Sequence, residues 1–198
     1  MAELEADPEW VAARDAEDRE AELAEAASRE RQVPLLADLS AAGVEVADVW
    51  ELVNTSKPYP AAIPVLVEHL HRDYKAGILA GIARALAVTD AAQFWDEVME
   101  LFLASDPDNV RIYQGLGVAL SGMATRSLLP QVREVLLDQS LGPGRIFFLS
   151  TLGRLRAPDR WDIIGELVDD PDVGAEAAHL LHQRGLREAT KARRSAGS

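Results

Sequence analysis

Four aspartates recur through the chain at nearly constant intervals. They are Asp73, Asp106, Asp138 and Asp170, separated by 33, 32 and 32 residues, and an apolar residue stands three positions before each. The segments around them carry apolar residues at i, i+3, i+4 and i+7, the spacing of an amphipathic helix. A period of roughly 20–50 residues with one pair of helices in each period predicts stacked repeats, because one pair cannot bury its own apolar face.

The apolar spacing predicts a succession of helices and no sheet. No segment shows the sustained alternation of apolar and polar residues that a half-buried strand requires. We therefore expect an all-α chain. The helices expected in its main body cover residues 61–73, 74–88, 94–103, 110–123, 128–137, 146–155, 163–168 and 175–182.

The N-terminal segment begins with the signals of a helix start. Asp7 is a suitable N-cap, Pro8 suits the first helical position, and Glu9 adds a negative charge in the first turn. Few large apolar residues follow before Val33, so this helix is expected to be mostly solvated. Between Val33 and Asn54 the sequence predicts two short helices. The first ends at Gly43, and the second is marked by the apolar residues Val46, Val49, Trp50 and Val53.

These observations divide the chain into three parts that differ in charge. The expected parts are a charged helical arm over 1–32 (net −7), a repeat domain over 33–186 (net −9) that starts with a divergent cap over 33–57, and a basic flexible tail over 187–198 (net +3). The whole chain has a formal charge of −13. A net-negative surface repels phosphate backbones, so we expect no nucleic-acid partner.

Two segments resemble a known repeat family. "DPDNVR" (106–111) and "DPDVGAEAAHLL" (170–181) are similar to the inter-helix turn and second helix of HEAT repeats, and the resemblance covers about residues 60–185. In the third repeat "DQSLGPGR" replaces the Asp-Pro turn. The resemblance implies an α-solenoid of about five stacked antiparallel helical hairpins after the N-terminal charged helix. It implies little about chemistry, because packing defines this family.

Composition limits the chemistry and the compartment. The chain has no cysteine, which excludes disulfides and thiolate zinc sites. The N-terminus "MAELEADPEW" lacks a basic n-region, and no apolar run approaches the roughly 18 residues of a membrane span. We expect a cytoplasmic protein without a membrane partner. The chain has 17 arginines but only 3 lysines, which is typical of a GC-rich bacterial genome.

The candidate metal and catalytic motifs are incomplete. His69 and His71 lie about 200° apart around a helix, so one ion cannot bind both, and they are expected on its polar margin. Glu176, His179 and His182 form a row that suits the polar outer face of a terminal repeat. The glycine-rich "GLGVALSG" lacks a preceding strand and is expected to allow close helix packing. We therefore expect no metal, no cofactor and no catalytic residue.

The outward positions of the second helices suggest a partner-binding surface. In HEAT-like stacks these helices line the concave side, where arginine and aromatic residues would anchor an interface. The alternative is that the arginines cap helix ends and pair with neighbouring acids. The residues expected to bind a partner are Arg84, Arg111, Gln114, Arg145, Phe148 and Arg154.

Three classes of function are compatible with these observations. The leading hypothesis is a non-enzymatic interaction or adaptor module that binds a protein or peptide on its concave surface, although the acidic exterior also suits a basic partner. The first alternative is a HEAT-like DNA-repair glycosylase, which needs a basic groove and a catalytic carboxylate beside aromatic residues. The second is a lyase or chaperone for a cofactor, which needs a ligand-sized pocket.

Overall fold

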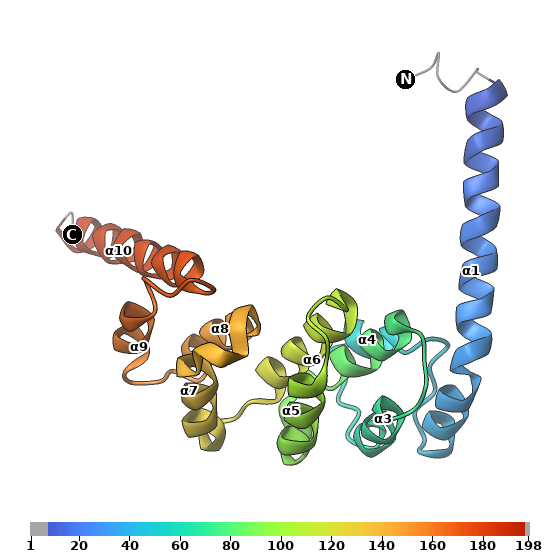
Figure 1. Cartoon of the computed structure of the whole chain (residues 1–198), viewed down its shortest axis with the longest axis horizontal. Helices are drawn as coiled ribbons and strands as arrows, with labels where there is room; N and C mark the ends of the chain where they lie inside the picture. The colour runs from blue at the N-terminus through green and yellow to red at the C-terminus, as the bar shows by residue number, and fades with distance from the viewer. Residues whose placement is uncertain (1–7, 197–198) are drawn as a thin grey trace.

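The computed structural model describes residues 8–196. Within them all regular structure is helical, which confirms the all-α prediction (Figure 1). The α-helices are α1 (Pro8–Ala41), α2 (Trp50–Asn54), α3 (Ala62–Leu70), α4 (Ala76–Ala85), α5 (Trp95–Ala104), α6 (Val110–Met123), α7 (Leu129–Leu137), α8 (Ile146–Arg154), α9 (Arg160–Glu166) and α10 (Gly174–Ala196). The 3₁₀ segments are η2 (Thr89–Phe94), η3 (Arg126–Leu128) and η4 (Gln139–Arg145).

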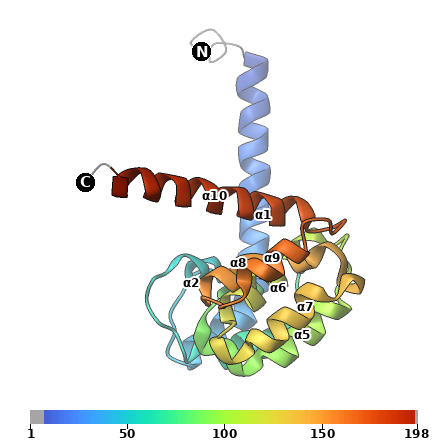
Figure 2. The same cartoon turned by 90° about the vertical axis from the view of Figure 1, so that its left-hand side faces the viewer.

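Consecutive helices pack in pairs. Helix α3 packs on α4, α5 on α6, α7 on α8, and α9 on α10; α6 also packs on both α4 and α8. Figure 1 shows α3, α5 and α7 along the lower side of the body and α4, α6 and α8 above them. The long helices α1 and α10 extend from opposite ends of the body, on the side of α4, α6 and α8, and point in different directions (Figure 2).

The recurring aspartates occupy the turn after the first helix of each pair, as the sequence predicts. They follow α3, α5, α7 and α9 in order. Three of the four carboxylates accept a hydrogen bond from the backbone N–H two residues later. These bonds are Asp108 N to Asp106 Oδ1 (2.9 Å), Ser140 N to Asp138 Oδ1 (3.0 Å) and Asp172 N to Asp170 Oδ1 (3.0 Å). This local turn gives a physical reason for the aspartate period.

A continuous apolar core connects the helix pairs. Leu86, Leu120 and Leu152, which belong to the second helices of three successive pairs, contribute directly to this core, since all three are 0% exposed. The apolar residue before each aspartate is less uniform: Leu167 is buried, whereas Leu103 is 54% exposed. The period therefore predicts the turns better than it predicts the core positions of the first helices.

The N-terminal arm and the first predicted cap helix form one helix. Helix α1 runs without a break to Ala41 and includes Pro34, so one helix crosses the predicted boundary at residue 33. A proline removes one i→i−4 hydrogen bond. The helix continues because Leu35 and Leu39 are fully buried. Its predicted end is confirmed, since Gly43 has φ +80° and donates to Ser40 O at 2.9 Å.

The limits of two other helices differ from the sequence pattern. Helix α10 continues to Ala196, so residues 187–196 of the segment predicted as a flexible tail are helical. Helix α2 begins at Trp50, four residues later than the apolar pattern suggests. The predicted N-cap Asp7 lies outside the described residues. No helix in the described part of the chain is long and apolar enough to cross a membrane.

Candidate functional site

Helices α4 and α6 approach closely because glycines face their contact. A Cβ added at Gly115 would lie 3.1 Å from Ala80 Cα, and one at Gly122 would lie 2.5 Å from the Ala87 carbonyl oxygen. Both contacts relate residues 35 positions apart, so the two helices run parallel in a fixed register. This confirms that the glycine-rich segment serves close helix packing.

Three of the predicted partner-binding residues meet beside this contact. Arg84, Arg111 and Gln114 line one cavity of about 320 Å³, which we call the α4–α6 cavity. Gly77 is part of its floor, where a Cβ would lie 3.8 Å from Arg111 Nη1. The remaining lining residues are Trp50, Ile78 and Ala80. Two arginines, an amide and an indole thus surround a small-residue floor.

Trp50 also lines this site, although it was not among the residues expected to bind a partner. Its side chain is 39% exposed, and its ring lies against Gly81, where a Cβ would be 3.1 Å from Trp50 Nε1. The sequence does indicate where the helix that carries Trp50 begins, because the Asp-x-x-Glu spacing of Asp48 and Glu51 is typical of a helix start. Asp48 Oδ1 accepts from Trp50 N at 2.8 Å, so the helix begins here.

The arginines of the α4–α6 cavity have no carboxylate partner among the described residues. Arg84 is half-buried and its Nε is buried without a hydrogen bond, while Arg111 is exposed. Elsewhere Arg72, Arg133 and Arg145 each pair with nearby acids. Because no carboxylate pairs with these two guanidinium groups, the cavity has a local positive potential, although the chain as a whole has 33 acidic residues.

Arg145 does not belong to this surface, contrary to the prediction. Its side chain is 0% exposed and donates to Asp170 Oδ2 at 2.9 Å and to Asp170 Oδ1 at 2.7 Å. It also donates to the carbonyl oxygens of Gly142 (3.0 Å) and Leu136 (3.1 Å). The 3₁₀ segment η4 precedes α8 and turns Arg145 inward. The arginine therefore joins two inter-helix turns.

Phe148 is also buried, which corrects its assignment to the exposed surface. It is 0% exposed and contacts Trp95 and Phe102 edge-on, with ring centroids 6.1 and 6.2 Å apart. Ile146, at the start of the same helix, is 41% exposed. Helix α8 is therefore rotated relative to the predicted orientation, and the aromatic cluster sets that rotation.

Arg154 fits the alternative to partner binding, which is that the arginines cap helix ends. Its Nη2 donates to the carbonyl oxygens of Ser121 and Ala124, the latter at 2.9 Å, at the C-terminal end of α6. Burial lowers the pKa of Arg154. The residue also borders a second cavity of about 540 Å³, which includes Val118, Phe147 and Glu176. Arg154 is thus primarily a capping residue.

The histidines occupy three different environments. His69 is 0% exposed, so its assignment to a polar margin is wrong: Nε2 donates to Asp38 Oδ2 at 2.9 Å, and Nδ1 is hydrogen-bonded to the Tyr74 hydroxyl at 2.7 Å. The bond from His69 holds the pKa of Asp38 below its usual value. His71 is exposed and lies 2.7 Å from Glu97 Oε1. His179 and His182 are exposed on α10.

Comparisons with known proteins identify no relative of this chain. No protein-family model matches it, and no curated protein or solved structure does. Within the residues that the structure describes, no group of three or more His, Cys, Asp or Glu side chains is arranged to hold a metal ion.

Proposed function

We propose that this protein is a short HEAT-like α-solenoid that acts as a non-enzymatic binding module. In this role, an extended peptide segment of a partner protein binds across α4 and α6. The observation that carries it is the α4–α6 cavity, where Arg84 and Arg111 lack carboxylate partners beside the exposed Trp50. Arginine and tryptophan contribute strongly at protein interfaces because they combine apolar contact with directional hydrogen bonding.

The charge of the cavity indicates the chemistry of the peptide. A carboxylate that enters between the two guanidinium groups would form charge-assisted hydrogen bonds, which are stronger than neutral ones. Gln114 can donate to or accept from a peptide backbone. The ring of Trp50 offers an apolar wall for the neighbouring side chain or the backbone. We therefore propose that the peptide presents at least one aspartate or glutamate to the α4–α6 cavity.

The lining of the cavity supports binding rather than catalysis. None of its seven lining residues is an aspartate, glutamate, histidine, serine, threonine or lysine, the types that serve most often as general bases or nucleophiles. Arginine and glutamine can bind and orient a charged group, but guanidinium remains protonated and does not act as a base near neutral pH. This composition favours recognition of a partner.

A selection from a random peptide library tests the proposal. Immobilised full-length protein should enrich peptides with Asp or Glu at one fixed position next to an apolar or aromatic residue. A parallel selection on the Arg84→Gln/Arg111→Gln variant should not enrich that pattern. Selected peptides without any acidic position, or the same pattern on both proteins, would refute the proposed recognition.

A further inference from the structure

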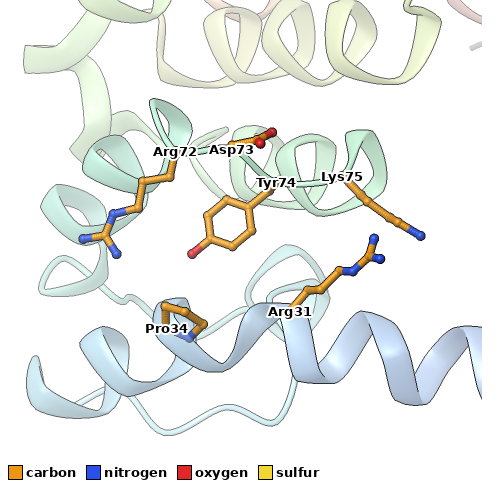
Figure 3. A pocket seen from close by; sticks show the side chains of 6 residues that line it. All are labelled: Arg31, Pro34, Arg72, Asp73, Tyr74 and Lys75. Atoms are coloured by element: carbon orange, nitrogen blue, oxygen red, sulfur yellow. The ribbon is translucent and has the colours of Figure 1, made fainter.

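A different cavity lies where the long helix α1 meets the turn between α3 and α4. It has a volume of about 560 Å³ and is lined by Arg31, Pro34, Arg72, Asp73, Tyr74 and Lys75 (Figure 3). Three of these six side chains are cationic, in a chain of net charge −13. We call this the α1–α4 cavity. It shares no lining residue with the α4–α6 cavity.

Two of the polar side chains already have partners. Arg72 pairs with Glu68 through Nη2 at 2.5 Å and with Asp38 through Nη1 at 3.3 Å. The Tyr74 hydroxyl is hydrogen-bonded to His69 Nδ1 at 2.7 Å. These contacts hold the wall of the cavity in place. They also use much of the hydrogen-bonding capacity of both side chains within the fold itself.

Arg31 and Lys75 have no hydrogen bond or ion pair within the part of the chain that the structure describes. Arg31 rises from α1, and Lys75 extends from the start of α4 toward the same end of the cavity (Figure 3). The carboxylate of Asp73 points away from α1 in this view. Two positive charges from separate elements thus face one space, while the carboxylate of Asp73 at its edge points away from α1. Such a pair repels itself unless an anion lies between its members.

We propose that the α1–α4 cavity binds a phosphate-type dianion, as inorganic phosphate or as a phosphate monoester. A dianion matches the two unpartnered charges of Arg31 and Lys75, and its several oxygens can accept from both side chains at once. The start of α4 adds partial positive charge, because Lys75 is its N-cap and no side chain caps it. The bound group would connect α1 directly to α4.

Titration of the full-length protein with inorganic phosphate tests this site. Calorimetry at constant ionic strength should show saturable binding, with O-phosphoserine as a second probe and acetate as a monoanionic comparison. Tighter binding of phosphoserine would identify a monoester as the ligand, and tighter binding of phosphate would identify the free ion. We expect Arg31→Gln and Lys75→Gln each to weaken the affinity about tenfold, the scale of one lost charge-assisted contact.

Two further variants distinguish specific binding in the α1–α4 cavity from a general electrostatic attraction of phosphate to the protein surface. Lys75→Arg keeps the charge and should keep the binding, whereas Arg126→Gln removes an exposed cation that lines neither cavity and should change nothing. Circular dichroism checks that each variant folds. The proposal is overturned if wild-type protein shows no saturable binding of either phosphate probe, or if Arg126→Gln weakens binding as much as Arg31→Gln does.

Discussion

Arg145 and Asp170 form a two-point ion pair at 2.9 and 2.7 Å that joins two inter-helix turns 25 residues apart. The side chains of Arg145 and Asp170 are only 0% and 2% exposed. Asp170 Oδ1 also accepts from the backbone N–H groups of Asp172 and Val173, so one carboxylate organises the turn before α10. This ion pair therefore fixes the distance between the α7–α8 pair and the α9–α10 pair.

Loss of Arg145 should therefore destabilise the protein strongly. Arg145→Ala leaves the Asp170 carboxylate buried without its main partner, and breaking a buried pair in this way costs about 3 kcal/mol or more. Urea unfolding followed by circular dichroism measures the difference. Arg126→Ala, on the exposed η3 segment, provides the matched control and should stay within about 0.5 kcal/mol of wild type. Equal stabilities of the two variants would contradict the assigned role of Arg145.

The same pair predicts a specific acid dependence. The hydrogen bond from Arg145 lowers the pKa of Asp170 from 3.8 to about 2. Because the folded-state pKa is lower than the unfolded one, this group stabilises the fold above about pH 4 and loses that contribution as the pH falls toward 2. Melting temperatures from pH 5 to pH 2 should fall more steeply for wild type than for Asp170→Asn. Parallel curves would show that Asp170 does not titrate as proposed.

Two glycine substitutions should have opposite effects. A Cβ at Gly122 would lie 2.5 Å from the Ala87 carbonyl oxygen, so Gly122→Ala must push α6 away from α4. We expect a loss of about 1–3 kcal/mol, the usual cost of overpacking. Gly153 lies in α8 with nothing within 4 Å of an added Cβ. Gly153→Ala should instead gain about 0.5–1 kcal/mol from helix propensity. Denaturant midpoints of both variants check this, and two changes of the same sign would contradict it.

His69 and His71 should differ in their contribution to stability. His69→Ala removes a buried side chain that connects Asp38 on α1 with Tyr74, and loss of buried hydrogen bonds costs about 1–3 kcal/mol. His71 makes an exposed contact with Glu97, and such pairs contribute about 0–1 kcal/mol. Thermal unfolding of the two alanine variants at neutral pH compares them directly. A larger loss for His71→Ala would show that the contact to α1 is not structural.

The sequence predicted the helices and turns well because those depend on local spacing. Each aspartate turn needs only an acceptor two residues before a free N–H, so Asp106, Asp138 and Asp170 mark turns without knowledge of the fold. Helix α6 begins at Val110 and ends at Met123 as expected, since its apolar pattern is regular.

The orientation of individual side chains was harder to predict, because it depends on distant residues. Arg145 turns inward because it pairs with Asp170 in the turn between the next two helices. Helix α8 carries two adjacent phenylalanines, so the sequence alone does not determine which of them is buried. The contacts with Trp95 and Phe102 place Phe148 in the core. Helix α1 passes through Pro34 because Leu35 and Leu39 are buried by tertiary packing. Local preference alone favours a break there.

The affinity of a selected acidic peptide for cavity variants tests the proposed function most directly. Fluorescence anisotropy would compare wild type with Arg84→Gln/Arg111→Gln, and melting temperatures would be read on the same samples. Arg126→Glu serves as the charge-matched control outside the α4–α6 cavity.

We predict that the double variant melts within about 2 °C of wild type, as expected for side chains outside the core. Its affinity should fall by about 100-fold, the effect of losing two charge-assisted contacts of about 1.4 kcal/mol each. The Arg126→Glu control should bind like wild type. A double variant that melts like wild type and binds the peptide with unchanged affinity would contradict the account.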